Sequence, residues 1–329
     1  MLALSKSDLK QLVTMEQCIE LVKDAFVELY QDRADVPLRL GLDVEPGKDV
    51  TLLMPAHMPK LNALGFKVVS VFQSNGDRKI PVTSAMVNMV DAETGVPNAI
   101  INGSYLTQLR TGAVSGAGAQ LMSREDSRNL VVIGGGAQGV TQAAAIAAVR
   151  DIEKITIVDR FEASFDRFRD AIAQDWPHIS DRLVFSTDGE APVRDADIIC
   201  LATTSKQPVF DAAWVKPGTH VSGVGSFTPE MQETPQDFVV NARIVVDMKE
   251  HALAETGDLI IPLENGSLQE SDIVGELGGL VLGEFEGRTA NDENTFFKSV
   301  GNAVQDISVG SYAVKQALEQ GIGQQIDLG

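Results

Sequence analysis

The chain is short of basic residues. It has 27 Lys and Arg against 46 Asp and Glu, so its formal net charge is −19. Nucleic acids and anionic membrane surfaces are polyanions, and we therefore expect neither as a partner. No uninterrupted apolar run approaches the roughly 20 residues that a membrane-spanning helix needs. The composition favours a protein that binds a small molecule.

Cysteine is also scarce. Cys18 and Cys200 are far apart in the sequence, and each lies in an apolar pattern. This favours two buried thiols in a reducing compartment over a disulfide framework. Residues 1–8 lack the apolar core of a signal peptide, so the expected location is the cytoplasm.

Sequence patterns for two other kinds of chemistry are missing. The four histidines, His57, His178, His220 and His251, show no spacing typical of metal ligands, and we predict no metal site. No G-x-S-x-G segment occurs, which argues against a hydrolase of that type.

A glycine-rich turn is the most informative segment that the chain does have. Residues 130–139 pass from an apolar strand through Gly134, Gly136 and Gly139 into an alanine-rich stretch, which fits G-x-G-x-x-G. A second apolar run, 155–158, ends at Asp159, where a carboxylate can accept hydrogen bonds from the adenosine ribose. Because the start of the following helix attracts phosphate groups, this βαβ context predicts a dinucleotide-binding site.

The pattern of apolar runs predicts an α/β protein with a Rossmann-type, doubly wound parallel sheet and a second, discontinuous α+β domain. Helices are expected over 7–30, with Ser7 and Asp8 as the start signal, and over 106–122. A hairpin is expected around 91–95, and the tail over 295–320 is expected to be helical without strands. The expected parallel strands are 130–134, 154–158, 182–186, 197–202, 219–224 and 243–247.

Several segments together resemble the ornithine cyclodeaminase/mu-crystallin family. They are residues 65–70, 91–97, 106–113, 134–139 and 297–301, and they occur in the family's order over essentially the whole chain. The resemblance implies a substrate-binding and dimerisation domain over 1–119, completed by 299–329, and a Rossmann domain over 120–298. It also implies NAD(H) or NADP(H) as cofactor, a small imino or amino acid as substrate, and a homodimer.

The resemblance also assigns roles to individual residues. Arg39, Lys67 and Arg110 match the positions that hold the substrate carboxylate, and Val300 is a further substrate contact. Arginine suits this task because its planar fork can bind a carboxylate with two hydrogen bonds. Lys67 is the expected catalytic residue, since its apolar neighbours could lower its pKa enough for proton exchange with an imine nitrogen. The expected cofactor-binding residues are Arg110, Gly134, Gly136, Ala137, Gln138, Gly139, Asp159, Arg160, Thr203, Thr204, Val224 and Gly225. For Thr203 and Thr204, ordinary capping of a loop is an equal alternative.

Two departures from the family pattern narrow the expected activity. Phe227 occupies the position at which ornithine cyclodeaminases carry a catalytic Asp, and Leu52 stands where they carry a Glu before Leu-Met-Pro. Without either carboxylate, the second ammonium of ornithine has no evident partner, which would be costly. Asp306 could reach the pocket, but a carboxylate on a helix surface is the preferred interpretation.

These observations predict reduction of a small cyclic imino acid, Δ1-pyrroline-2-carboxylate and its six-membered homologue, to the L-amino acid. The alternatives are an alanine-type dehydrogenase, an N-alkyl amino acid reductase, an ornithine cyclodeaminase, and a crystallin-like protein that binds the cofactor without turnover. Asp159 favours NAD(H), whereas the adjacent Arg160 could bind a 2′-phosphate and leaves NADP(H) open.

Overall fold

The structure is a computed structural model that describes residues 1–45, 48–78 and 80–327. It divides into two compact units. Unit 1 is Met1–Arg110 together with the chain from Asn302 on, and unit 2 is Thr111–Gly301. The sequence predicts domain boundaries at 119/120 and 298/299, whereas the two units divide at 110/111, within helix α3 (Gly103–Met122), and at 301/302.

Unit 1 is built on a mixed sheet. In the described part of the chain its seven strands have the order β15-β1-β6-β5-β4-β3-β2. Neighbouring strands are antiparallel except β1 and β6, which are parallel. The strands are β1 (Leu2–Leu4), β2 (Leu40–Glu45), β3 (Asp49–Met58), β4 (Ala63–Phe72), β5 (Thr83–Val90), β6 (Pro97–Asn102) and β15 (Gln324–Gln325).

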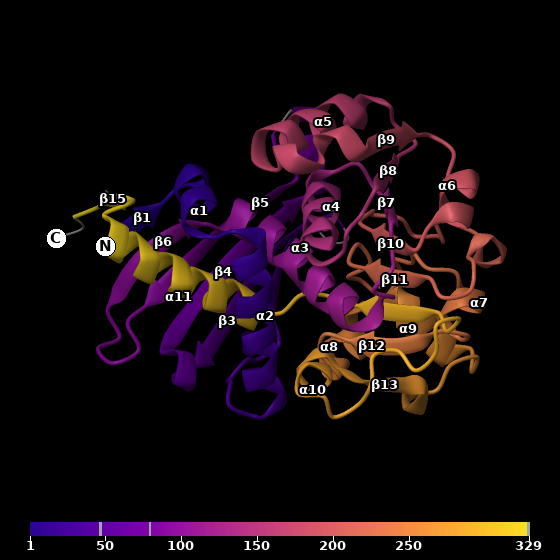
Figure 1. Cartoon of the computed structure of the whole chain (residues 1–329). Coiled ribbons are helices and arrows are strands. Elements are labelled where there is room, and N and C mark those ends of the chain that lie inside the picture. The colour runs from indigo at the N-terminus through magenta and orange to yellow at the C-terminus, as the bar shows by residue number, and fades with distance from the viewer. Residues whose placement is uncertain (46–47, 79, 328–329) are drawn as a thin grey trace. The chain divides into compact units, whose positions relative to one another are not determined.

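Helices cover one face of this sheet. The long helix α11 (Ala303–Gln320) lies across β3, β4 and β5 and packs beside α2 (Met15–Tyr30) (Figure 1). Burial alternates along β4, so that Ala63, Gly65, Lys67 and Val69 face the helices. The remaining helices of unit 1 are α1 (Lys6–Leu12) and the short 3-10 turns η1 (Pro59–Leu61) and η2 (Gln73–Arg78).

The start of the chain differs from the sequence-based expectation. A short strand, β1, precedes the first helix, and the helix begins after Ser5 rather than at Ser7 and Asp8. Ser5 is the N-cap because its hydroxyl accepts a hydrogen bond from the Asp8 amide while the Asp8 carboxylate accepts from the Ser5 amide. A strand of three residues is too short to show a period of two in the sequence.

Unit 2 is a doubly wound α/β layer structure. In the described residues its eight strands are all parallel, with the order β13-β12-β14-β11-β10-β7-β8-β9. The strands are β7 (Asn129–Ile133), β8 (Lys154–Val158), β9 (Leu183–Ser186), β10 (Ile198–Leu201), β11 (His220–Gly223), β12 (Arg243–Val246), β13 (Ile273–Glu276) and β14 (Thr295–Lys298).

Helices connect these strands. They are α4 (Ala137–Val149), α5 (Ala163–Asp175), α6 (Glu190–Asp195), α7 (Gln236–Val239), α8 (Lys249–Glu255), α9 (Gly257–Glu264) and α10 (Leu277–Val281). Short 3-10 turns are η3 (Pro177–Arg182), η4 (Ala212–Trp214) and η5 (Glu270–Asp272).

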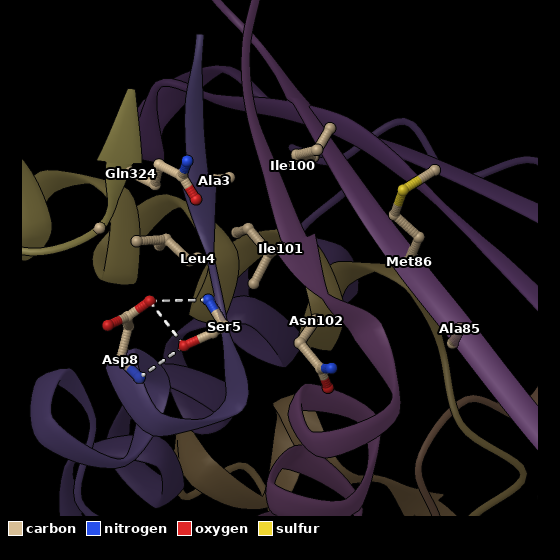
Figure 2. Close-up of a pocket in the computed structure, with 11 residues that line it drawn as sticks. Ala3, Leu4, Ser5, Asp8, Ala85, Met86, Ile100, Ile101, Asn102 and Gln324 are labelled. Atoms are coloured by element: carbon tan, nitrogen blue, oxygen red, sulfur yellow. Dashed lines mark hydrogen bonds between the residues drawn. The ribbon is translucent and has the colours of Figure 1, made fainter. Parts of the chain in front are cut away.

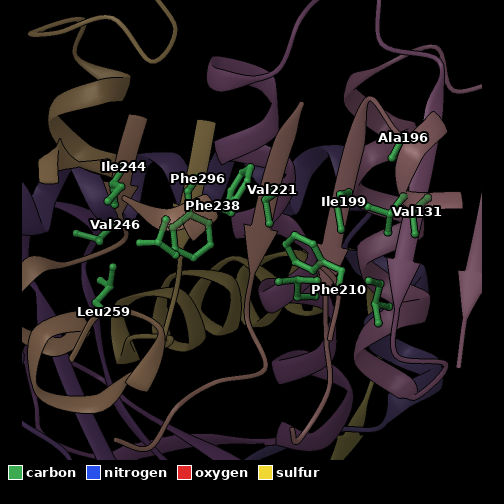
Figure 3. Packing of buried hydrophobic residues seen from close by; sticks show 14 of the residues in the cluster. Val131, Ala196, Ile199, Phe210, Val221, Phe238, Ile244, Val246, Leu259 and Phe296 are labelled. Carbon is green, nitrogen blue, oxygen red and sulfur yellow. The ribbon is translucent and has the colours of Figure 1, made fainter. Parts of the chain in front are cut away.

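The core of unit 2 lies on both faces of its sheet. Val131 and Ile199 point to one face, where Phe296 meets the ring of Phe238 edge-on at a centroid distance of 6.4 Å (Figure 3). Leu130 belongs to a second cluster on the opposite face. Strands buried on both faces need nearly continuous apolar runs, which explains why most of them were recognisable in the sequence.

The expectation that 295–320 is helical without strands is wrong. Strand β14 (Thr295–Lys298) inserts between β11 and β12, and only the part from Ala303 on is helical. This strand has four residues and ends in a lysine, so its apolar run was too short to be told from the start of a helix. Strand β13 was also missed, because its sequence, Ile-Val-Gly-Glu, has only two apolar side chains.

Candidate functional site

A buried ion pair is the most unusual feature of unit 1. The Lys67 ammonium donates a hydrogen bond to Asp306 Oδ2 over 2.6 Å, and the two side chains are 1% and 0% exposed. Lys67 comes from the middle of β4, where Met54 and Val87 are its neighbours on β3 and β5. Asp306 lies in the first turn of α11, where the helix dipole favours a negative charge.

Glycine allows helix and sheet to approach closely enough for this pair. A Cβ atom on Gly65 of β4 would overlap the Asn88 carbonyl and press on Ile307 of α11. A Cβ on Gly310 of α11 would press on the sulfur of Met89. The backbone contact restricts position 65 to glycine, whereas a side chain at position 310 would require Met89 to shift. The two glycines bring the start of α11 down onto β4.

Arg110 completes the cluster. Its Nε donates to Asp306 Oδ1 at 3.1 Å and its Nη1 donates to Gln305 Oε1 at 2.9 Å. Gln305 Oε1 also accepts from the Asn302 amide and closes the capping box at the start of α11. The residue that fixes the helix start thus also orients the guanidinium.

Burial controls the protonation of Lys67. Desolvation, reinforced by the positive charge of Arg110, lowers the pKa of Lys67 to about 7. The carboxylate of Asp306 opposes this fall through its charge and hydrogen bond, while the charge of Arg39 adds to it. A lysine with a pKa near neutrality can both donate and accept a proton, which suits acid–base catalysis.

The surroundings of Lys67 on the sheet are apolar. Leu52 of β3 pairs with Val69 of β4, on the helix-covered face that Lys67 also occupies. Arg39, which directly precedes β2, is half-buried. Leu52 thus places an alkyl side chain, not a carboxylate, on the face of the sheet that carries Lys67.

Two sequence-based interpretations need correction here. Asp306 is not a helix-surface carboxylate but a fully buried partner of Lys67 and Arg110. Of the apolar sequence neighbours expected to desolvate Lys67, Val69 shares its face of the sheet, whereas Phe66 and Val68 face the opposite side. Gln305 was missed altogether.

In unit 2 the glycine-rich turn has the geometry of a phosphate-binding loop. Gly134 has a φ of +115°, and Gly139 contacts the Gly134 carbonyl so closely that a Cβ would overlap it. Gly136 is the N-cap of α4 without a side-chain cap, and no atom lies within 4 Å of where its Cβ would be. Ala137 is exposed beside it.

Asp159 lies next to this turn. Its Oδ2 accepts from the Gly135 amide at 2.8 Å and its Oδ1 accepts from the Phe161 amide at 2.9 Å. Each carboxylate oxygen has two lone pairs, so both retain capacity for a further donor. Arg160 is exposed, and its guanidinium lies 5.4 Å from the centre of the Phe161 ring.

The other expected cofactor residues of unit 2, and Val300, the expected substrate contact, lie at the same edge of the sheet, whereas Arg110 lies in unit 1. Thr203 and the exposed Thr204 follow β10, Val224 and Gly225 follow β11, and Val300 follows β14. These strands are parallel to β7, so all of these residues lie at the carboxyl edge together with the glycine-rich turn. Val300 is 8% exposed, and its amide donates to Asp247 Oδ2 at 3.0 Å.

The residues of this edge fit a dinucleotide. The first amides of α4 have no side-chain cap, and the space where a Cβ of Gly136 would lie is open, so a pyrophosphate can approach the backbone there. Helix N-termini of this kind bind phosphate. Gly134, Gly136, Gln138, Gly139 and Asp159 are therefore the residues that would hold NAD(H) or NADP(H) in this unit.

Other candidate sites carry less chemistry. A groove of about 570 Å³ in unit 1 has Asp8 as its one charged lining residue, and this carboxylate already accepts hydrogen bonds from Ser5 (Figure 2). Among the residues that the structure describes, no group of three or more His, Cys, Asp and Glu could hold a metal ion. No helix in the described ranges is long and apolar enough to cross a membrane.

Comparisons with known proteins agree with this geometry. The sequence profile of the ornithine cyclodeaminase/mu-crystallin family matches residues 1–321. Δ1-Pyrroline-2-carboxylate reductase of Bacillus cereus is 39% identical over 328 residues, which cover 99% of this chain and 100% of that protein.

Solved structures give the same picture. The Thermococcus litoralis Δ1-pyrroline-2-carboxylate reductase in complex with NADH and L-proline superposes with a TM-score of 0.94 at 36% identity, covering 99% of this chain and 100% of that one. An archaeal alanine dehydrogenase dimer with bound NAD gives a TM-score of 0.90 at 29% identity, covering 100% and 99%. These neighbours confirm the α/β class predicted from the sequence. By its profile and by its full-length relatives, the chain belongs to the ornithine cyclodeaminase/mu-crystallin family.

Proposed function

We propose that this chain catalyses the NADH-dependent reduction of Δ1-pyrroline-2-carboxylate to L-proline. The observation that carries the proposal is the buried cluster of Lys67, Asp306 and Arg110, which combines cationic donors for a carboxylate with a lysine whose pKa is about 7. The names of relatives such as the Bacillus cereus enzyme indicate the same class of reaction as this proposal, an NAD-dependent oxidoreduction at a carbon–nitrogen bond.

The substrate carboxylate binds to the cations of unit 1. Arg110 uses its Nε and one Nη1 hydrogen for Asp306 and Gln305, and a guanidinium has five donors, so others remain for a ligand. Arg39 is the second carboxylate ligand in this proposal. Lys67, with three donors, spends one on Asp306 and can direct another to the substrate.

Lys67 also transfers the proton. Reduction of the cyclic imine adds a hydride to the carbon and a proton to the nitrogen of the C=N bond. NADH, which the residues at the carboxyl edge of the unit 2 sheet would hold, would supply the hydride and be oxidised to NAD⁺. Lys67 Nζ donates the proton to the imine nitrogen and is reprotonated from water, while Asp306 keeps the ammonium in place between turnovers.

The sequence has neither carboxylate at the two positions at which ornithine cyclodeaminases carry one. Phe227 cannot accept a proton, and Leu52 provides no partner for a second ammonium. Leaving that ammonium unpaired would cost several kcal/mol, of the order of 2–5. We therefore propose a substrate with one nitrogen and an apolar ring, and the six-membered homologue is proposed as a second substrate.

A substrate panel tests the proposal. NADH oxidation is measured with Δ1-pyrroline-2-carboxylate, with its six-membered homologue, with pyruvate plus ammonia, and with L-ornithine plus NAD⁺. We expect the five-membered imine to give the highest kcat/KM, and ornithine to release no ammonia. Higher kcat/KM with pyruvate plus ammonia would instead assign an alanine dehydrogenase, the alternative favoured by the similarity to the archaeal enzyme. NADH binding without turnover of any member would assign a binding protein.

We also propose a homodimer that forms through β2. Leu40 and Leu42 lie on one face of this edge strand and Val44 follows at a β-bulge, and the three side chains are 57%, 60% and 61% exposed. A row of exposed apolar side chains on an edge strand is a recognised site of association. The archaeal alanine dehydrogenase neighbour is described as a dimer.

A further inference from the structure

A buried carboxylate in unit 2 joins two loops of the carboxyl edge. Glu233 Oε1 accepts hydrogen bonds from the Thr203 amide at 2.6 Å and from the Thr203 hydroxyl at 2.8 Å. Its Oε2 accepts from the amides of Gly225 at 2.7 Å and Ser226 at 3.0 Å. One side chain thereby fixes the loops that follow β10 and β11.

The position of these loops in the fold indicates which half of the dinucleotide would bind against them. The strand order reverses between β7 and β10, because β8 and β9 continue on one side of β7 while β10 and β11 lie on the other. A dinucleotide binds across such a reversal. Asp159 follows β8 and belongs to the adenosine side, so the loops held by Glu233 belong to the nicotinamide side.

The carboxylate does not stand alone in the interior. Glu233, Asp258 and Lys298 are all 0% exposed, and Lys298 Nζ lies 3.2 Å from Asp258 Oδ2. Asp258 Oδ1 accepts from the amides of Glu233 and Thr234 at 2.8 and 2.9 Å. Burial raises the pKa of Glu233, and the charge of Lys298 opposes this rise. Lys298 thus helps to keep a negative charge at a site where four donors require an acceptor.

The geometry of Gly225 depends on the same contact. A Cβ at this position would overlap both oxygens of the Glu233 carboxylate. The loop after β11 is therefore packed directly against the Glu233 carboxylate.

We propose that Glu233 is a positioning residue for the nicotinamide half of the dinucleotide: by accepting from Thr203, Gly225 and Ser226 it sets the two loops against which that half binds. This inference rests on the proposed use of NADH. It extends that proposal to Glu233, Asp258 and Lys298, none of which was recognised in the sequence as part of a site.

The test is Glu233→Gln. A glutamine amide has one acceptor oxygen, and its NH₂ group would face the donors of one loop, so that loop loses its anchor. We expect NADH to bind about tenfold more weakly in a fluorescence titration without imino acid, the loss that corresponds to one hydrogen bond to a charged group. The KM for NADH should rise with it, while the KM for Δ1-pyrroline-2-carboxylate stays unchanged.

Asp197→Asn is the matched control. Asp197 is a buried carboxylate at the opposite edge of the same sheet, where it accepts from the amides of Arg128 and Asn129, both at 2.9 Å. Both variants remove a buried anionic acceptor and should lower the Tm, but Asp197→Asn should leave the Kd for NADH within about twofold of the wild type. If Glu233→Gln fails to fold, Glu233→Asp keeps the charge and is too short to hold both loops.

The inference is overturned if the Glu233 variant that folds binds NADH as tightly as the wild type. It is equally overturned if Asp197→Asn weakens NADH binding as much as the Glu233 variant does. Failure of the proposed reaction is a separate result: a wild type that binds NADH but does not reduce the imine refutes the reaction and leaves the comparison of Kd values intact.

Discussion

Lys67 Nζ and Asp306 Oδ2 lie 2.6 Å apart, although 239 positions separate the two residues in the chain. Removing Asp306 would leave the cations of Lys67 and Arg110 without their shared carboxylate in the interior of unit 1, which is strongly destabilising. The pair therefore has a structural cost that needs a functional reason. In our account the reason is a lysine poised to transfer a proton at neutral pH.

Replacement of Lys67 tests its catalytic role. We expect Lys67→Ala to lower kcat for imine reduction by about two orders of magnitude or more, the range typical of a positioned proton donor. The Kd for NADH should hardly change, because Lys67 lies in unit 1 and the expected dinucleotide contacts lie mainly in unit 2. A variant that retained most of its turnover would remove Lys67 from the catalytic residues.

The pH dependence follows from the pKa of Lys67, which is about 7. Imine reduction needs the protonated amine, so its rate should fall as the pH rises through this value, whereas L-proline oxidation needs the neutral amine and should rise. Because Asp306 raises this pKa, Asp306→Asn should move both pH-dependent transitions, the fall in imine reduction and the rise in L-proline oxidation, to lower pH. Glu319→Gln, at the exposed end of the same helix, is the control and should leave both transitions in place. If both transitions stay at the same pH in Asp306→Asn, another group governs the pH dependence of the rate.

Cofactor preference should depend on Asp159. Its carboxylate repels a 2′-phosphate, and we expect the wild type to use NADH at least as well as NADPH. Asp159→Ser should shift the ratio of kcat/KM values toward NADPH by about tenfold, because Arg160 remains to bind the phosphate. If the wild type already prefers NADPH by that factor, Arg160 and not Asp159 determines the choice.

The dimer proposed to form through β2 is open to a direct mutational test. Leu42→Glu would place a charge within the apolar row of Leu40, Leu42 and Val44, and we expect sedimentation velocity to show a monomer. Leu318→Glu, at a leucine of α11 that is 64% exposed, is the control and should remain dimeric. Dimers of unchanged stability in both variants would place the interface elsewhere.

Much of the fold could be predicted from the sequence, because local signals are strong in it. The strands of unit 2 are apolar runs buried on both faces, and Gly134, Gly136 and Gly139 mark one turn with a narrow set of uses. The hairpin between β5 and β6 was signalled by its turn residues. The strands that could not be predicted, above all β13 and β14, are short and have few apolar residues.

The candidate site was less predictable, because its contacts join distant segments. Asp306 looks like a surface residue in isolation, yet Ala303, Asp306, Gly310, Ala313 and Ala317 recur at spacings of three and four and form one buried stripe of α11. That pattern could have indicated its burial. Glu233 lies in a loop and has no comparable signal, since only the folded chain brings Thr203 and Gly225 to it. The roles of these residues stay predictions.

Isotope transfer tests the central claim most directly. Δ1-Pyrroline-2-carboxylate is incubated with the protein and NADH that carries deuterium at the transferred position of the nicotinamide, and the amino acid formed is analysed by NMR and chiral chromatography. Our account predicts L-proline with one deuterium at Cα and an equal amount of NAD⁺. Proline without deuterium, or no proline while NADH remains bound and unoxidised, would contradict it.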